Sequence, residues 1–313
     1  MATPDAVAPS VTPPVVFSAP VVVVIGDVMV DIVVRPMGAF NQGSDTTSRI
    51  VAAPGGSASN QAVAFAGAGA EVHLVAVVGD DELGRAAIRG LATSKVQAHL
   101  EVLPEERTGV VVALVGPSGE RSMFTDRGAN LRLGKRALPR NLFTSGGHLH
   151  LSGYELLDDR TRPAALQALE LAATAGMTRS VDPSSAGPLA AVGAAAFFGW
   201  TEGLDWCCAN IEEGRVLTGA RQPAEVMAGL RRHYREVALT LGEDGVLFSG
   251  PGSELLHIAA ERVAVEDTTG AGDAFTGTFL ARRLSGDAPE VSLRAGLAAA
   301  ARVVTAAGAR SWG

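Results

Sequence analysis

The residues with the clearest chemical potential form one run near the end of the chain, residues 267–273, with the sequence DTTGAGD. The pattern predicts a turn that opens a helix running to about Leu284. The first N–H groups of a helix have no partner within the helix, and the aligned peptide dipoles place partial positive charge there. Because Gly270 and Gly272 lack side chains and Ala271 has only a methyl group, an anion such as phosphate can approach these amides closely.

Asp273 is the unexpected member of this run, since a carboxylate repels a passively bound phosphate. A carboxylate at this place has a use as a general base. It would remove the proton from a hydroxyl while that oxygen attacks a phosphorus atom held by the amides. The alternative is an ordinary glycine-rich loop in which Asp273 is a first-turn helix residue. Taken alone, the run leaves both interpretations open.

The elements that would position this loop alternate from about residue 20 onward between apolar, β-rich runs and alanine-rich helical stretches. Such alternation is typical of a sheet layered between helices, so we predict an α/β fold with a central, mostly parallel sheet. A further strand is expected over residues 262–265, directly before the loop. The expected parallel strands cover residues 21–25, 72–77, 148–151, 179–181, 206–209 and 237–241.

Two segments interrupt the alternation, residues 31–51 and 108–126. The first is polar and extended, and the second predicts a β-hairpin whose turn contains Pro117 and Gly119. Strands that no helix follows do not fit inside a parallel layer. We therefore expect a small sheet at one edge of the main domain, acting as a lid that excludes water from a bound substrate. A structural edge without motion is the alternative.

Composition narrows the classes of partner. The 313 residues carry a formal net charge of -7, with 26 Lys and Arg against 33 Asp and Glu, which disfavours nucleic acid as a partner. The longest apolar runs are shorter than the ~20 residues that span a bilayer, so no membrane association is expected. Residues 1–19 contain no Lys or Arg and several prolines, which indicates a flexible tail rather than a signal peptide and predicts a cytoplasmic protein. The adjacent Cys207 and Cys208 are expected to be reduced thiols in an apolar strand.

A second group of motifs lies in the N-terminal half, PGGSASN at residues 54–60 and GDDELG at residues 79–84. Together with residues 267–276, these motifs closely resemble the two signature regions of the ribokinase-like (PfkB) carbohydrate kinase family. The resemblance covers nearly the whole chain after residue 20. It implies a three-layer α/β/α fold with a small β-sheet lid, and one kinase domain over residues 20–313. The implied activity is ATP-dependent transfer of the γ-phosphoryl group to a hydroxyl of a small carbohydrate.

The resemblance also implies roles for individual residues. Asp273 corresponds to the catalytic base, and the amides of Gly270, Ala271 and Gly272 to the anion hole for the transferred phosphoryl group. Asp31 would accept hydrogen bonds from sugar hydroxyls. The residues implied to bind the sugar are Asp31, Gly55, Gly56 and Asn60.

The resemblance places the nucleotide near a second group of residues. The Asn-x-x-Glu motif, Asn210 to Glu213, would help to hold the magnesium ion and the phosphates, with Glu213 acting through water. A helix-capping role for Asn210 is compatible with this function. The turn that would bind ATP contains Thr240, Gly242 and Gly245, and a monovalent cation such as K⁺ would bind near Asp267, Thr269 and Gly308.

The acceptor is less sharply defined. Met29 and Ser57 stand where ribose-accepting members of the family have Asn and Lys, which disfavours ribose itself. Only 5% of the residues are aromatic, and this favours a sugar over a nucleoside, with Phe40 and Phe124 as the lid residues available to stack on a base. Arg121 and Arg127, in or beside the hairpin, are favoured as solvated surface residues over partners for a substrate carboxylate or phosphate, such as that of an acidic sugar.

Two alternatives to a sugar kinase stay open, a nucleoside kinase of the same family and a catalytically idle protein that binds sugar or nucleotide. The resemblance also implies a possible homodimer formed through the lid sheets.

Overall fold

The computed structural model describes residues 19–116 and 121–305. Within these ranges nine strands form one sheet in the order β13-β12-β11-β10-β9-β8-β1-β4-β5. All neighbours from β11 to β5 are parallel, whereas β12 and β13 pair antiparallel at one edge. The predicted central, mostly parallel sheet is therefore confirmed. Its strands are β1 (Val21–Ile25), β4 (Glu71–Gly79), β5 (Val96–Leu103), β8 (His148–Ser152), β9 (Thr178–Asp182), β10 (Trp206–Asn210), β11 (Glu236–Thr240), β12 (Val246–Ser249) and β13 (Leu256–Ile258).

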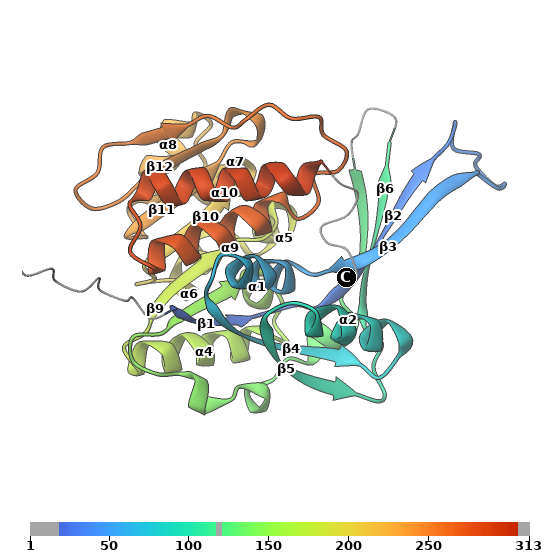
Figure 1. The fold of residues 1–313 in the computed structure, drawn as a ribbon, viewed down its shortest axis with the longest axis horizontal. Helices are drawn as coiled ribbons and strands as arrows, with labels where there is room; N and C mark the ends of the chain where they lie inside the picture. Colours follow the sequence, from blue (N-terminus) through green and yellow to red (C-terminus); the bar gives the residue numbers. More distant parts are fainter. Residues whose placement is uncertain (1–18, 117–120, 306–313) are drawn as a thin grey trace, which may run out of the picture.

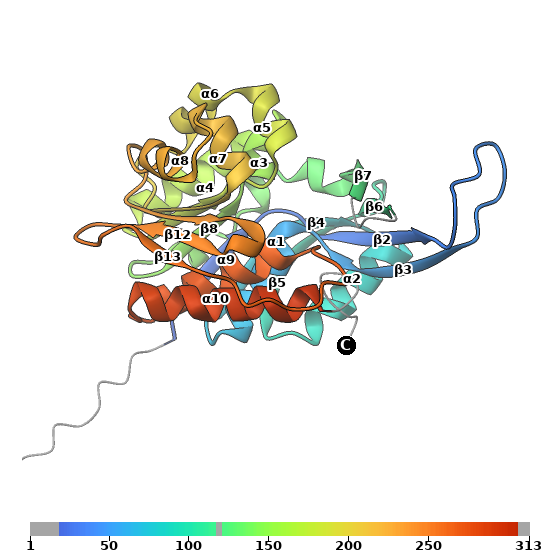
Figure 2. The ribbon, with the colours of Figure 1, turned by 90° about the horizontal axis from the view of Figure 1, so that it is seen from above.

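Helices cover both faces of this sheet, as Figures 1 and 2 show. One face is packed by α1 (Ser57–Gly67), α2 (Glu82–Ala92), α9 (Ala271–Leu284) and α10 (Pro289–Val304). The other is packed by α3 (Tyr154–Leu157), α4 (Arg162–Thr174), α5 (Ala186–Val192), α6 (Ala194–Trp200), α7 (Ile211–Thr218) and α8 (Pro223–Leu230).

The central strand β1 explains why the apolar runs are continuous rather than alternating. Val22 and Val24 belong to the core under α1 and α9, while Val23 and Ile25 belong to the core on the opposite face. A strand buried on both sides needs an apolar residue at every position, because successive side chains point to opposite faces.

The two interrupting segments form the expected separate sheet, in the order β3-β2-β6-β7. In Figure 1 this sheet extends from one edge of the main body. The turn of the predicted hairpin, residues 117–120, lies outside the described residues, as do nearly all of the predicted tail and Gly308. The four strands are β2 (Met29–Pro36), β3 (Ser48–Gly55), β6 (Gly109–Val115) and β7 (Arg121–Asp126).

The strand predicted over residues 262–265 is wrong. This stretch is irregular, and Val265 is 60% exposed. The described part of the large sheet ends at β13, so the segment pairs with no strand there, and Glu266 N and Asp267 N instead donate to the carbonyl of Val304 at the end of α10. The apolar residues that suggested a strand therefore do not pack against a neighbouring strand in the described sheet.

Close packing of α1 against α9 brings together the start of both helices. A Cβ atom at Gly277 would lie 2.5 Å from the carbonyl oxygen of Gln61 and 2.7 Å from the Cβ of Ala64. The absent side chain at Gly277 thus lets the two helix backbones approach each other, and this spacing controls where the first turns of α1 and α9 meet.

We predict that Gly277→Ala destabilises the protein by about 1–3 kcal/mol, because the added methyl group overlaps the backbone of α1. In a helix without such crowding, Gly→Ala is stabilising by up to about 1 kcal/mol. Gly199→Ala in α6 is the matched control, since its Cβ would meet no atom within 4 Å. Urea unfolding should separate the two variants, and equal stabilities would contradict the packing argument.

Candidate active site

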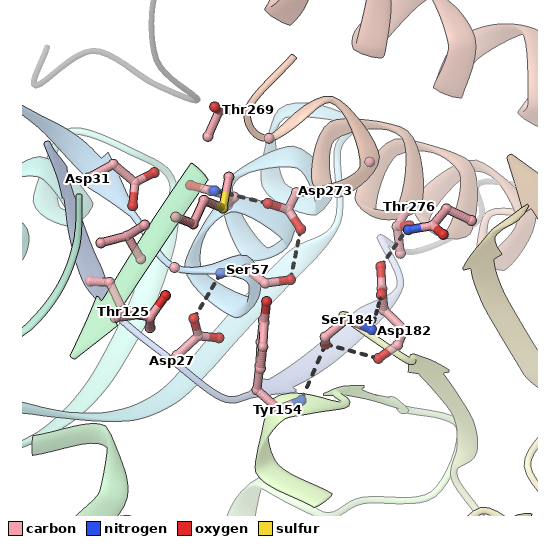
Figure 3. Close-up of a pocket in the computed structure, with 18 of the residues that line it drawn as sticks. Asp27, Asp31, Ser57, Thr125, Tyr154, Asp182, Ser184, Thr269, Asp273 and Thr276 are labelled. Atoms are coloured by element: carbon pink, nitrogen blue, oxygen red, sulfur yellow. Dashed lines mark hydrogen bonds between the residues drawn. The ribbon is translucent and has the colours of Figure 1, made fainter. Parts of the chain in front are cut away.

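A cavity of about 310 Å³ lies where the small sheet meets the carboxyl-terminal edge of the large one (Figure 3). Ligand sites of open α/β sheets lie at this edge, because loops and helix N-termini converge there. The lining comes from β2, β6 and β7, the start of α1, the ends of β9, β10 and β11, and the start of α9. Segments more than 200 residues apart in the sequence therefore share one wall.

Asp273 lies on this wall in the first turn of α9, and two side chains from α1 hold its carboxylate. Ser57 Oγ donates to Oδ1 at 2.8 Å, and Asn60 Nδ2 donates to Oδ2 at 2.9 Å. Burial raises the pKa of Asp273 to about 7, repulsion from Asp182 adds to this, and the two donors oppose it. The carboxyl is thus poised to exchange a proton near neutral pH.

The anion loop also reaches the cavity. Gly270 precedes α9 with φ +76°, in the left-handed region that glycine accepts without strain. Gly270 and Gly272 line the cavity with Asp273, whereas Ala271 is outside the lining and its amide donates to the carbonyl of Thr268. The amides of Gly272 and Asp273 have no backbone acceptor in the part of the chain that the structure describes, so they can receive an anion.

Asn60, predicted to bind the sugar, lines the cavity and also contacts the predicted base. Its amide nitrogen donates to Asp273 Oδ2, so the two residues are directly coupled. Its Oδ1 is buried and has no hydrogen-bond partner among the described residues. A buried acceptor without a donor is unfavourable, and a hydroxyl group of a ligand in the cavity would satisfy it.

Asp31, Gly55 and Gly56 lie together where the small sheet meets the cavity. Asp31 is on β2 and only 6% exposed, and a Cβ at Gly55 would lie 2.2 Å from its Oδ1. Gly56 has φ +91° directly before α1. Asp31 and Gly56 line the cavity and Gly55 packs behind Asp31.

Asp27 was missed by the sequence reasoning. Its carboxylate accepts hydrogen bonds from the amides of Ser57 at 3.0 Å and Ala58 at 3.1 Å. Asp27 therefore caps the N-terminus of α1, although it lies 30 residues before Ser57 in the sequence. Asp27 therefore orients the helix that carries the two donors to Asp273. The available signal was its position directly after a buried strand, where polar residues face the ligand edge of a parallel sheet.

At the opposite end of the cavity, Asn210 and Glu213 form a reciprocal capping box at the start of α7. Glu213 is 2% exposed, and burial raises its pKa. Asn210, Glu213 and Thr240 line the cavity, while Gly242 and Gly245 lie beyond its lining in the turn after β11. Asn210 thus caps α7 as predicted, and its capping partner Glu213 lines the cavity.

Asp182 and Ser184, at the end of β9, also line the cavity and were not predicted. Burial, together with repulsion from Glu213, raises the pKa of Asp182. Ser184 has φ +74°, and within the described ranges it is the one non-glycine residue with positive φ. Backbone strain of this kind persists where surrounding contacts enforce it, commonly at functional sites.

The residues predicted to bind a monovalent cation are partly described. Thr269 N and Thr269 Oγ1 both donate to Asp267 Oδ1, at 2.9 and 2.6 Å. Arg35 of β2 lies 3.5 Å from the other oxygen of Asp267 and donates to the carbonyl of Glu266 at 2.9 Å. A guanidinium group thus lies against the carboxylate for which a cation was predicted.

Arg127 is not the solvated surface residue that the sequence suggested. It lines the cavity and forms a 2.6 Å ion pair with Glu155, with side chains only 15% and 0% exposed. Burial raises the pKa of Glu155 to about 7, although the positive charge of Arg127 opposes the shift. The guanidinium also lies over the ring of Tyr154, 5.6 Å from its centroid.

We predict that Ser57→Ala raises the pKa of Asp273 above its value of about 7, because loss of the hydroxyl removes a donor to the ionised carboxylate. The expected shift is roughly 0.5–1 pH unit, the size of one net hydrogen bond. A ¹³C NMR titration of the Asp273 carboxyl carbon measures it. Ser94→Ala, whose hydroxyl donates to Leu91 O far from the cavity, should leave the titration unchanged.

The described residues contain no cluster of three or more His, Cys, Asp or Glu side chains that could hold a metal ion by themselves. In the same residues we find no helix long and apolar enough to cross a membrane.

Comparison with known proteins identifies the family. The model of the pfkB family carbohydrate kinases matches residues 20–312. The chain is 32% identical to the 2-dehydro-3-deoxygluconokinase of Thermoproteus tenax over 260 residues, which cover 80% of this chain and 78% of that protein.

Two solved structures share the ribokinase-like fold over 93% of the chain. The adenosine kinase from Sinorhizobium meliloti has a TM-score of 0.84 and 26% identity, with 95% of that chain covered. A fructokinase from Vibrio cholerae O395, in a form with fructose, ADP and calcium ion bound, has a TM-score of 0.78 and 25% identity, with 94% of that chain covered. The chain belongs to the pfkB family of carbohydrate kinases, phosphotransferases whose acceptor is an alcohol group.

Proposed function

We propose that this kinase transfers the γ-phosphoryl group of ATP to a hydroxyl of an uncharged sugar, with Asp273 as the general base. The observation that carries the proposal is the position of Asp273. Two donors on α1 hold its carboxylate, it lies beside the predicted anion-binding loop, and it lines the cavity. The relatives that the comparisons name as sugar kinases support the same reaction class.

In the proposed reaction, the sugar oxygen attacks the γ-phosphorus, the bond from that phosphorus to the bridging oxygen of ADP breaks, and the hydroxyl proton passes to Asp273. The amides of Gly272 and Asp273 stabilise negative charge on the transferred group. The contacts from Ser57 and Asn60 restrict the carboxylate to one orientation. Catalysis then depends mainly on alignment and charge stabilisation.

The lining favours a neutral sugar as the acceptor. Asp31 can accept hydrogen bonds from hydroxyls, and Asn60 Oδ1 is the buried acceptor described above. Arg127 is already paired with Glu155, which leaves it a weak partner for an acidic sugar. Tyr154 is the one aromatic residue in the described lining, while Phe40 and Phe124 are 70% and 63% exposed, so stacking of a nucleoside base has little support.

The donor set fits a magnesium ion bound with the nucleotide rather than one held by the protein alone. The clustered carboxylates Glu213 and Asp182 have raised pKa values, and a nearby divalent cation would relieve their repulsion. Because both oxygens of Glu213 accept hydrogen bonds from Asn210, contact through water is expected. The ion would neutralise charge on the phosphates.

A monovalent cation such as K⁺ near Asp267, Thr269 and Gly308 has less support, since Arg35 already places positive charge there.

A cytoplasmic location is part of the proposal. Cys207 and Cys208 are free, buried thiols in β10, as the sequence predicted, and unpaired cysteines suit a reducing compartment.

Asp273→Asn is predicted to lower turnover by roughly 10²–10⁴-fold, the usual contribution of a positioned base, while ATP affinity changes little. ADP release with a panel of neutral sugars, acidic sugars and nucleosides measures turnover and identifies the acceptor at the same time. Asp159→Asn, an exposed position outside the cavity, is the control. An Asp273→Asn enzyme with wild-type turnover would remove the base from the mechanism.

We also propose a homodimer formed through the lid sheets, because Ile50 and Phe124, which point away from the cavity, are 62% and 63% exposed on that sheet. Phe124→Asp should convert the dimer to a monomer, since a charge in an apolar interface is strongly unfavourable. Sedimentation velocity checks the mass. Val291→Asp, at an exposed position on α10, is the control, and a wild-type monomer at micromolar concentration would contradict the proposal.

A further inference from the structure

A line of buried polar side chains runs behind the active site, between β8, β9 and α1. Gln61, His148, His150 and Ser180 are each at most 1% exposed. The ring of Phe65 packs beside both imidazoles, with centroid distances of 6.5 and 5.5 Å. Buried polar groups are unfavourable unless they are hydrogen-bonded, so the contacts among these side chains must offset their desolvation.

These side chains form one continuous chain of hydrogen bonds that ends at the cavity. We define the buried chain as Thr178, His148, Ser180, His150 and Gln61. The distances from the inside outward are 2.9 Å (Thr178 Oγ1 to His148 Nδ1), 2.7 Å (His148 Nε2 to Ser180 Oγ), 2.6 Å (Ser180 Oγ to His150 Nδ1), 2.8 Å (His150 Nε2 to Gln61 Oε1) and 2.9 Å (Gln61 Nε2 to Asp182 Oδ2).

Within the buried chain, His148, Ser180 and His150 each donate one hydrogen bond and accept one. Burial lowers the pKa of His148 well below its usual value and that of His150 to about 3, so both rings are neutral. A neutral imidazole carries a proton on one nitrogen and a lone pair on the other. The hydroxyl of Ser180 has a single proton, so it donates to one histidine and accepts from the other.

The amide of Gln61 at the end of the chain therefore determines the direction of every bond. Gln61 donates its amide nitrogen to Asp182 Oδ2 and turns its oxygen toward His150. His150 must then carry its proton on Nε2 and accept at Nδ1 from Ser180. By the same logic His148 carries its proton on Nε2, and all five bonds donate toward Asp182. The opposite direction requires a protonated Asp182.

Negative charge surrounds the other side of Asp182. Glu213 of α7, Asp273 of α9 and Asp27 after β1 interact with it unfavourably. The remaining donors are the backbone N–H of Ser184 at 2.8 Å and Thr276 Oγ1 at 3.4 Å. The amide of Gln61 is therefore one of a small number of groups that stabilise the ionised form against its neighbours.

We propose that the buried chain is a positioning network that holds the carboxyl group of Asp182 in one orientation in the active site, against Thr276 one turn after Asp273 on α9. The functional part of this inference rests on the proposed kinase reaction, in which Asp182 would lie with Glu213 near the divalent cation bound with the nucleotide. The residues of the buried chain do not touch the substrate, and they act through Asp182.

The direction of the bonds has a spectroscopic signature that is independent of activity. Long-range ¹H–¹⁵N NMR of the full chain at pH 8 should show His148 and His150 neutral and both protonated on Nε2. In Gln61→Met, which is close in size and lacks the amide, His150 would leave an N–H without an acceptor. Both histidines are then expected to move their proton to Nδ1, including His148, which does not contact Gln61.

The same variant should lower kcat about tenfold, with KM for the sugar changed less than twofold, because Asp182 loses a donor near the phosphates rather than near the acceptor. Val181→Ala is the matched control. It lies beside Ser180 and Asp182 on β9 but packs in the core on the opposite face of the sheet, and it should leave tautomers and kcat unchanged.

Three results would overturn the inference: an Nδ1 proton or an imidazolium on either histidine in the wild-type protein, unmoved tautomers in Gln61→Met, or wild-type kcat in that variant when circular dichroism shows it folded. Absence of sugar phosphorylation by the wild-type protein would instead refute the proposed function, and the NMR result would still decide whether the chain points toward Asp182.

Discussion

The meeting of two helix N-termini controls this active site. Helix α9 supplies both the anion-binding amides and Asp273, and α1 supplies the two side chains that hold Asp273. Neither helix can move without changing the geometry of the other, because Gly277 allows their backbones to pack in direct contact. Asp27 in turn fixes α1 from the end of β1. The proposed base must meet a hydroxyl and a phosphorus atom at once, and it is thereby located by the core of the protein and not by a loop.

Charge is the second constraint. Asp27, Asp182, Glu213 and Asp273 face one cavity, and burial with mutual repulsion raises the pKa of the last three. This arrangement is unfavourable in the empty protein, but it suits a site that receives a nucleotide with a divalent cation and then removes a proton near neutral pH. The hydrogen-bond donors around each carboxylate, among them Ser57, Asn60, Asn210 and Gln61, limit the cost.

The sequence predicted the sheet, the helical layers and the loop at 267–273, because those features depend on local periodicity and on glycines with a clear backbone role. It predicted a strand at 262–265 wrongly, because apolar residues alone do not reveal whether a neighbouring strand is present. Asp27, Asp182 and Arg127 were missed or misread, since their partners lie about 30 residues or more away along the chain. Asn60 was found as a site residue, but its bond to Asp273 depends on the α1–α9 contact, which no sequence spacing reports.

The buried polar chain suggests why the core behind the site is not wholly apolar. An apolar replacement of His148, Ser180, His150 and Gln61 together would avoid their desolvation, and such swaps are often neutral or stabilising elsewhere. Here the replacement would also leave Asp182 with fewer donors against three neighbouring carboxylates. Stability alone gives no reason to keep two neutral histidines at the centre of a parallel sheet. The need to hold a carboxyl group in one orientation in the adjoining cavity does, since each residue of the chain is required to orient the next.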